Sequence, residues 1–375
     1  MLVVDHHQVE SRSDALAVWS KEYSAAGLAL MLSWGLLEKF GVAGDSATEF
    51  LSSLSRLAAI AAIADCVPLV GATRILTQLG LEALPHARHA GLAKLMELSG
   101  CRGVFAPSSE QIAFRLAPRI NAAGRVGHPA RVIEMFDAPT PEIAVSKAVE
   151  LNDLNQERRR LEKEALGELL RSAGDSCGSC VVVYGQGWKK GIAGILASRA
   201  RERYGVPAFV LVKDERTGLA VGSGRSVEGL NLVDALRACA PLLHRYGGHS
   251  EAAGLTLKVE DIPMFRKRLE EYLGRNTPLP PAKVRAEASL NFADLTRPFY
   301  EQLRLWEPFG IGNPAPVFAI PNATLDAAAG ETVMIRQGTR ALKARCQVNT
   351  GNGEVGEVLL SMTATSATLL AFAGA

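Results

Sequence analysis

Residues 181–212 read VVVYGQGWKKGIAGILASRARERYGVPAFVLV, and this stretch decides the fold class. Val181–Tyr184 is a short β-branched run that predicts a buried strand. A glycine-rich loop follows, and Gly191–Tyr204 has the apolar spacing of a helix. Ala208–Val212 predicts a second buried strand. A strand, a helix and a second strand in this order predict a βαβ unit, so the fold class is α/β.

On its N-terminal side, residues 140–174 predict one long helix. Thr140 is a suitable N-cap, Pro141 fits the first helical position, and apolar residues recur at roughly helical spacing to about Ala173. Within this helix, residues 157–160 read ERRR and are expected to form a solvated face. A helix of this length between two domains is expected to be a connector.

The rest of the chain predicts three further parts. Residues 1–139 alternate helical patterns with short apolar runs, and we expect a partial parallel-sheet domain there. Residues 175–275 form the domain around the βαβ unit. The stretch NTPLPP at 276–281 reads as a linker. Residues 282–375 read mainly as short strands with turns and predict a small β-barrel.

Composition limits the classes of function. The 375 residues allow two or three domains, and the formal net charge of +2 means that nucleic-acid binding would need a local basic groove. Cys177 and Cys180 have no second ligand pair for zinc, so reduced thiols in a cytoplasmic protein are expected. No signal-peptide pattern is present. The uncharged residues 358–375 are interrupted by Ser and Thr, so no membrane span is expected.

Asp5, His6 and His7 follow a short apolar run that predicts a strand. In open α/β sheets, functional groups often lie at strand ends. His and Asp are suitable ligands for divalent manganese, zinc or iron, and carboxylates favour manganese and magnesium. The alternative is a hydrogen-bonded pair of surface histidines.

A carboxylate at a predicted helix end adds to this group. Residues 50–63 predict an apolar helix, and Pro68 stops it, which places Asp65 near the end. Asp65 is therefore a candidate ligand for the same ion.

Residues 118–125 read PRINAAGR. Arg119 and Arg125 flank Asn121 and several small residues, which allow close approach of a ligand to the backbone. Arginine is suited to bidentate contact with phosphate. The alternative is an ordinary loop with surface ion pairs.

Two glycine-rich stretches lie in the domain around the βαβ unit. Residues 222–226 read GSGRS, and a Gly/Ser turn there would form an anion-binding nest to which Arg225 adds a charge. Residues 246–254 read YGGHSEAAG, where the paired glycines free the backbone and His249 can donate to a phosphate oxygen. Each stretch is a weak signal by itself.

Taken together and in order, these stretches resemble the DHH phosphoesterase superfamily and, within it, the RecJ single-strand-specific exonucleases. The resemblance covers most of the chain to about residue 318. Its pieces are VVDHH, AAIADCVPL, PRINAAGR, LNDLNQERR, GIAGILASRARERYGVP, GSGRS, YGGHSEAAG and EPFGIGNPAPVF. The last piece resembles the start of the RecJ OB-fold, which agrees with the predicted barrel.

The resemblance implies a two-lobed enzyme with a two-metal site for Mn²⁺ or Mg²⁺. Such a pair of ions activates a water and stabilises the leaving oxygen of a phosphodiester. On the family pattern, His6 and Asp65 are metal ligands, Asp5 supports the ligand cluster, and His7 faces the scissile phosphate.

The resemblance also implies how the substrate is held. A single strand threaded between the lobes would be degraded from 5′ to 3′, and a duplex would be excluded sterically. The expected role is DNA repair and recombination, with a single-strand-binding protein or a helicase as expected partners. The implied substrate-binding residues are Arg119, Asn121, Arg125, Ser223, Arg225, Ser226, Gly247, Gly248 and His249.

The sequence departs from the family pattern in one important respect. The family carries an Asp-x-Asp motif and a later Asp on strands before the DHH strand, and no Asp-x-Asp occurs in these 375 residues. Two protein ligands rarely hold an ion well. We therefore expect an N-terminally truncated chain that is inactive or weak alone, with an incomplete parallel sheet. The OB-like region also fades after Cys346.

Two other functions remain open. One is a non-catalytic remnant that still binds single-stranded nucleic acid. The other is a DHH phosphodiesterase acting on short oligonucleotides or cyclic dinucleotides, although such enzymes generally lack the PRINAAGR stretch and the OB module.

Overall fold

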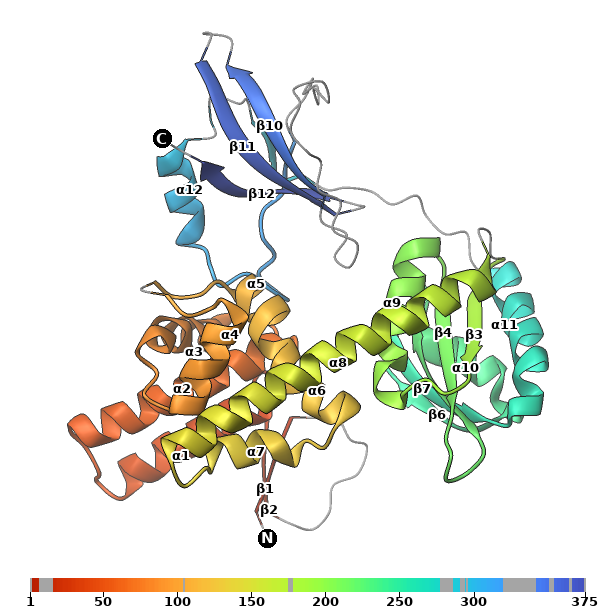
Figure 1. The fold of residues 1–375 in the computed structure, drawn as a ribbon, viewed down its shortest axis with the longest axis horizontal. Helices are drawn as coiled ribbons and strands as arrows, with labels where there is room; N and C mark the ends of the chain where they lie inside the picture. The colour runs from red at the N-terminus through yellow and green to blue at the C-terminus, as the bar shows by residue number, and fades with distance from the viewer. Residues whose placement is uncertain are drawn as a thin grey trace. The chain divides into compact units, whose positions relative to one another are not determined.

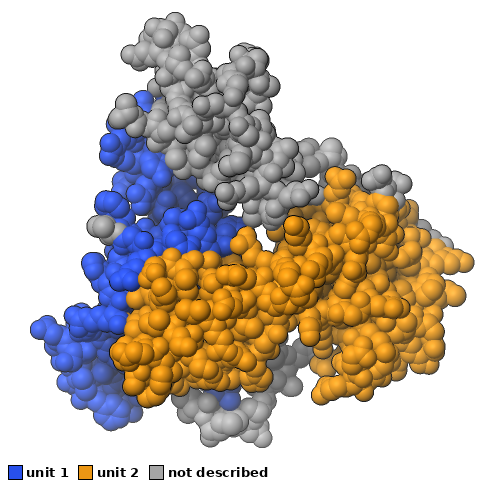
Figure 2. Space-filling view, in the orientation of Figure 1, with its two compact units in different colours: residues 1–88, 99–117, 282–375 blue, residues 89–98, 118–281 orange. Residues whose placement is uncertain are grey.

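The structure is a computed structural model. It describes residues 2–6, 16–103, 105–174, 178–276, 286–290, 294 and 296–319, together with the backbone of the strands between residues 342 and 373. The chain divides into two compact units, which Figure 2 shows in different colours. Unit 1 comprises residues 1–88, 99–117 and 282–375, and unit 2 comprises residues 89–98 and 118–281.

Unit 1 begins with a parallel pair of short strands, followed by helices (Figure 1). Of the predicted parallel sheet, the described residues show this one parallel pair, and the rest of the described N-terminal region is helical. The elements of unit 1 before α6 (Ala117–Val126) are β1 (Leu2–Asp5), β2 (Leu16–Trp19), α1 (Ala25–Lys39), α2 (Asp45–Ala64), α3 (Gly71–Ala83), a 3₁₀ turn (Leu84–His86), α5 (Ser109–Gln111) and a turn of π-helix (Ile112–Leu116).

Helix α2 starts five residues before the predicted range and forms the core of unit 1. Asp45 stands in its first turn, where a carboxylate is favourable. By length and composition α2 could cross a membrane. Several of its residues, including Ala59, are buried, and it packs closely against α3, as expected for a core helix. It ends at Ala64 with Asp65 as its C-cap, and Cys66 then adopts a positive φ of 55° before Pro68.

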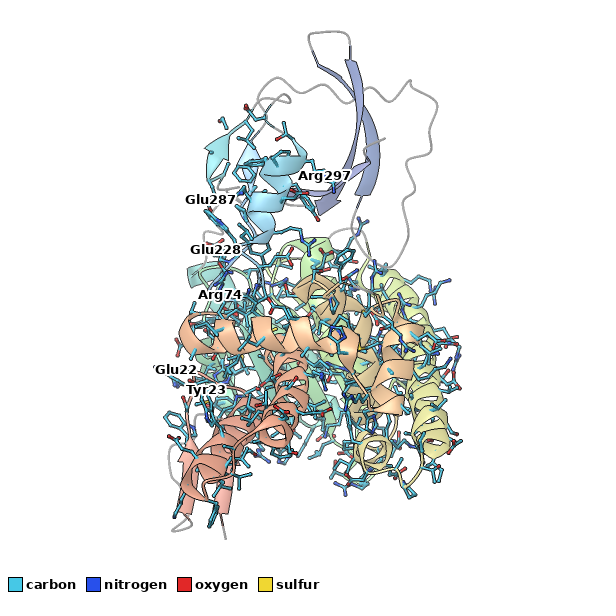
Figure 3. All side chains as sticks on the ribbon, turned by 90° about the vertical axis from the view of Figure 1, so that its left-hand side faces the viewer. Glu22, Tyr23, Arg74, Glu228, Glu287 and Arg297 are labelled. Atoms are coloured by element: carbon cyan, nitrogen blue, oxygen red, sulfur yellow. The ribbon has the colours of Figure 1, made fainter. Side chains whose placement is uncertain are left out.

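The segment 305–313 packs against the start of α3. Arg74, labelled in Figure 3, donates through Nη2 to the carbonyl oxygens of residues 305–307 at 3.0–3.4 Å. The backbone N–H of Leu69 donates to the carbonyl oxygen of Ile311 at 2.6 Å. These bonds tie the EPFGIGNP stretch to the turn that follows α2.

The partly buried carboxyl group of Glu307, in this segment, should make the free energy of unfolding depend on pH. Burial raises the pKa of its carboxyl group, Arg304 lowers it, and Glu110 raises it again. As pH rises above the ordinary glutamate pKa, the unfolded chain releases this proton before the folded chain does, so stability falls. Glu307→Gln is therefore expected to stabilise the protein at neutral pH relative to wild type, and the gain should disappear in acid.

Chemical denaturation at neutral and acidic pH measures this difference. The control is Glu287→Gln, which removes a carboxylate from an exposed position and should change stability by no more than about 0.5 kcal/mol. An equal effect of Glu307→Gln at both pH values would contradict the prediction.

The C-terminal part of unit 1 contains strands, as predicted. Strands β10 to β12 form an antiparallel sheet, and β8 pairs with β9 in parallel. The uncharged residues 358–375 contribute the second half of β11 and all of β12. The bounds are β8 (Ala288–Ser289), α12 (Arg297–Arg304), β9 (Phe318–Ala319), β10 (Leu342–Thr350), β11 (Glu354–Thr363) and β12 (Ser366–Ala373).

Unit 2 contains the predicted long helix and βαβ unit. Thr140 caps α8, Pro141 is its first residue, and the helix runs 33 residues to Ala173, which confirms the prediction. The bounds in unit 2 are α4 (Ala90–Ser99), α6 (Ala117–Val126), α7 (Ala130–Phe136), α8 (Pro141–Ala173), β3 (Val181–Gly185), a 3₁₀ turn (Lys190–Ile192), α9 (Ala193–Tyr204), β4 (Ala208–Lys213), β5 (Ala220–Arg225), α10 (Leu232–Ala238), β6 (Leu243–Gly248), β7 (Ala252–Leu257) and α11 (Ile262–Asn276).

The sheet of unit 2 has five strands in the order β3-β4-β5-β7-β6. Strands β3 and β4 are parallel, as the βαβ prediction requires, and the other pairs are antiparallel. One face packs against α9 and the end of α8, through residues such as Leu169 and Leu196. The other face packs against α10 and α11, through residues such as Phe209 and Phe265 (Figure 1). This layered packing fixes the end of β5, where the candidate site lies.

Candidate functional site

His6 and Asp65 meet in unit 1. His6 follows β1, and its Nε2 lies 3.2 Å from Oδ2 of Asp65 at the end of α2. The backbone N–H of His6 donates to Oδ1 of Asp5 at 2.8 Å, which fixes the turn after the strand. His7 lies outside the described residues. The structure thus brings two of the predicted metal-site residues together.

These donors suit a divalent ion but do not complete a site. Imidazole nitrogen and carboxylate oxygen are ligand types that Mn²⁺ accepts. Within the described ranges, no group of three or more His, Cys, Asp and Glu side chains is placed to hold a metal. His6 and Asp65 would fill only part of the coordination shell of Mn²⁺ or Mg²⁺, so the described residues do not fit a two-metal centre.

The PRINAAGR stretch lies in helix α6, so the alternative of an ordinary loop is wrong. Arg119 is held inside unit 2, since its Nε donates to Oδ1 of Asn152 at 3.0 Å and its Nη2 to the carbonyl oxygen of Leu98 at 2.8 Å. Asn121 and Arg125 are exposed. Arg125 is thereby the arginine of this stretch that faces solvent.

The predicted anion-binding turn at residues 222–226 is wrong. Residues 220–225 form β5, and this strand pairs with β4 on one side and β7 on the other. Its backbone N–H groups therefore serve the sheet and cannot form a nest. Packing explains why glycine occupies these positions, since a Cβ at Gly224 would lie 2.5 Å from the Phe209 ring. They allow close packing between strands and layers.

Arg225 ends this strand with its guanidinium fixed in place. Its Nη1 donates to Oγ of Ser223 at 2.7 Å and to the carbonyl oxygen of Gly224 at 2.8 Å. Burial lowers the pKa of this guanidinium, and the positive charges of Arg125 and Arg201 lower it further.

Sequence reasoning missed the role of Gly194 in α9. A Cβ at Gly194 would lie 2.8 Å from Nη2 of Arg225 and 3.3 Å from Oγ of Ser223. The absence of a side chain at this position makes room for the guanidinium. The only local signal is a glycine in the first turn of a helix, and that signal is not specific.

The second glycine-rich stretch lies beside the end of β5. Gly248 has a φ of 145°, and a Cβ there would collide with the carbonyl oxygen of Ala252. His249 follows it and is exposed. The backbone N–H of Ser226 donates to the carbonyl oxygen of Glu251 at 2.9 Å, so the two stretches are joined.

Ser226 and Gly247, the other predicted substrate-binding residues, differ in their exposure to solvent. Ser226 is 4% exposed, and its hydroxyl donates to the carbonyl oxygen of Leu230 at 2.7 Å, so this hydroxyl is used internally. Gly247 is an exposed residue of β6 opposite Gly254. The structure thus brings Ser223, Arg225 and His249 to one end of the sheet, whereas their contacts with substrate remain a prediction.

Comparison with protein families finds two matches. Residues 178–275 match the DHHA1 domain. Residues 286–354 match the RecJ OB domain. The first range covers the sheet of unit 2, and the second begins four residues after the start of the predicted barrel domain.

Curated relatives carry the name single-stranded-DNA-specific exonuclease RecJ. The protein of Bacillus subtilis (strain 168) is 33% identical over 344 residues, which covers 87% of this chain and 42% of the relative. The protein of Thermus thermophilus is 34% identical over 304 residues, covering 81% of this chain and 43% of the relative. The chain thus spans less than half the length of these two relatives.

Two solved structures are also similar. RecJ from Thermus thermophilus in complex with Mn²⁺ has a TM-score of 0.79 at 30% identity, covering 99% of this chain and 58% of that one. An exonuclease RecJ bound to manganese has a TM-score of 0.62 at 32% identity. This second match covers 76% of this chain and 71% of that chain.

Proposed function

Because this chain belongs to the RecJ family of DHH phosphoesterases, we propose that it binds single-stranded DNA and serves its 5′-to-3′ hydrolysis in DNA repair and recombination. The observation that carries the proposal is the fixed guanidinium of Arg225 at the end of β5. Single-stranded DNA is the proposed partner, and the cytoplasm is the proposed location.

The chemistry of this site suits a phosphate group. A guanidinium presents a planar fork of donors that matches two phosphate oxygens. The internal hydrogen bonds of Arg225 fix its orientation before substrate arrives, which reduces the entropy lost on binding. His249 is exposed, and its backbone N–H donates to the carbonyl oxygen of Ala252, the residue that pairs with Arg225 on β7, so its imidazole would be a second donor. Arg125 adds a further positive charge.

We further propose Mn²⁺ or Mg²⁺ as the cofactor, because RecJ has been solved with each of these ions. When bound, the ions would supply an activated water and charge stabilisation at the scissile phosphate. Among the residues that the structure describes, His6 and Asp65 supply two donors, and we therefore expect this chain to hydrolyse DNA weakly or not at all.

Arg225→Gln tests the proposed function. Hydrogen bonds to a charged group contribute about 1.5–3 kcal/mol, so the variant should bind single-stranded DNA roughly ten- to a hundredfold more weakly. Fluorescence anisotropy of a labelled oligothymidylate measures this affinity. A duplex competitor of the same length should bind more weakly than the single strand.

The matched control is Arg237→Gln, which removes an exposed arginine paired with Asp234 on α10. Its affinity should stay within about twofold of wild type. Equal affinity of the Arg225 variant and wild type would contradict the proposal. Tighter binding of dinucleotides than of long strands would instead favour an enzyme of short oligonucleotides. Strong manganese-dependent release of nucleotides would contradict the expected weak activity.

A further inference from the structure

Arg158, in the middle of α8, does not belong to a solvated face as predicted. Its side chain is 14% exposed, whereas the side chain of Arg160, two residues later, is 55% exposed. Arg160 pairs with Glu157 and Glu164 on the helix surface. Within the described residues, the buried Nε of Arg158 has no hydrogen-bond partner. An unpaired buried donor costs about 1–3 kcal/mol, so this arrangement calls for an explanation.

One carboxylate serves two guanidiniums beside it. Nη1 of Arg158 donates to Oε2 of Glu162 at 3.1 Å, and Nε of Arg199 on α9 lies 3.5 Å from Oε1 of the same residue. Arg199 also reaches Glu202 at 3.3 Å. Glu162 therefore neutralises Arg158 only in part.

Further positive charges face Arg158. Burial lowers the pKa of its guanidinium, Glu162 raises it, and Arg125, Arg159 and Arg199 lower it. Arg125 acts on the pKa of Arg225 in the same way. Arg125 is also anchored nearby, since its Nη1 donates to the carbonyl oxygen of Gly191 before α9.

Arg125, Arg158 and Arg225 thus form an arginine triad contributed by α6, α8 and β5, all in unit 2. Like charges that gather in a partly buried site repel one another unless an anion joins them. The phosphates of a DNA strand are a regular series of such anions. A phosphate would also offer Nε of Arg158 the acceptor that the protein does not provide.

We propose that Arg158 binds a backbone phosphate of single-stranded DNA, beside the phosphate held by Arg225 and Arg125. The proposal deepens the proposed function and rests on it. Glu162 is the competing acceptor in the free protein. Arg158 leaves this carboxylate in part when the strand binds.

The salt dependence of DNA binding tests this role in the 375-residue chain. Each phosphate contact of a single strand contributes about 0.7 to the slope of log affinity against log salt concentration. Arg158→Gln should therefore lower the affinity for an oligothymidylate roughly tenfold and reduce the slope by about 0.7. Arg158→Lys should restore the slope but only part of the affinity, because lysine keeps the charge without the planar fork.

Two further variants separate binding from support of the fold. Arg160→Gln is the matched control on the same helix and should keep both slope and affinity. Glu162→Gln removes the competing carboxylate and should tighten binding and steepen the slope. If the ion pair of Arg158 and Glu162 only stabilised the fold, both Arg158→Gln and Glu162→Gln would weaken DNA binding in proportion to the thermal stability that they lose.

Each outcome decides a point. If Arg158→Gln keeps the salt slope of the wild-type chain, or if a folded Glu162→Gln binds DNA more weakly, the assignment of Arg158 is overturned. The proposed function still stands in that case, provided that the wild-type chain binds single-stranded DNA. Absence of salt-dependent binding by the wild-type chain overturns both. If Arg158→Gln fails to fold, the sign of the Glu162→Gln effect decides.

Discussion

Gly191→Ala is expected to reduce affinity for single-stranded DNA more than tenfold. A Cβ at Gly191 would collide with the backbone of Arg125, including its carbonyl oxygen. Backbone cannot rotate aside as a flexible side chain does, so the end of α6 must separate from the 3₁₀ turn. That shift would displace Arg125 and break its 3.1 Å hydrogen bond to the carbonyl oxygen of Gly191.

The same overlap should lower the stability of unit 2 by about 1–3 kcal/mol, the usual cost of overpacking. Oligothymidylate anisotropy and chemical denaturation measure the two effects. The control is Gly274→Ala on α11, where nothing lies within 4 Å of the added Cβ, and a stability gain of up to about 1 kcal/mol is expected. Unchanged DNA affinity in Gly191→Ala would show that the position of Arg125 does not matter for binding.

Gly80→Ala is expected to destabilise unit 1 by about 3 kcal/mol or more, at the upper end of overpacking effects. At Gly80, α3 lies so close to α2 that no space remains for a side chain. An added Cβ would collide with the carbonyl oxygen of Ser55 and lie 2.5 Å from Cβ of Ala59. Ala59 is fully buried, so the helices must move apart.

Hydrogen exchange of peptides from residues 45–83 measures the loss directly in α2 and α3. Protection should fall there, while peptides from the sheet of unit 2 keep theirs. The control is Gly35→Ala in α1, which adds the same methyl group where nothing lies within 4 Å and should not destabilise. Unchanged protection over residues 45–83 in the Gly80 variant would contradict the close packing of the two helices.

The regular elements could be predicted because their signals are local. Thr140 and Pro141 marked the start of α8, and the hydrophobic spacing carried the prediction to its end at Ala173. The β-branched runs on either side of α9 gave β3 and β4 within one residue of their bounds. Caps and periodicity act over a few residues, so a sequence window contains the information.

The strand β5 was mistaken for a turn because its glycines are required by contacts with residues that are distant in the sequence. A Cβ at Gly222 would lie 2.5 Å from the carbonyl oxygen of Val210 on the neighbouring strand. No local pattern distinguishes a glycine required by such packing from one required by a turn. Arg158 was misjudged for the same reason, since its side chain is 14% exposed and the charges that act on it include Arg199 on α9 and Arg125 on α6.

The sequence by itself determined the order of elements and, through its ordered motifs, the RecJ resemblance. Only the tertiary structure decided which side chains meet. It places His6 against Asp65 and brings Arg125, Arg158 and Arg225 together from three separate elements. Local conformation is encoded by neighbouring residues, whereas a charged site depends on how helices and strands pack across a hundred residues of chain.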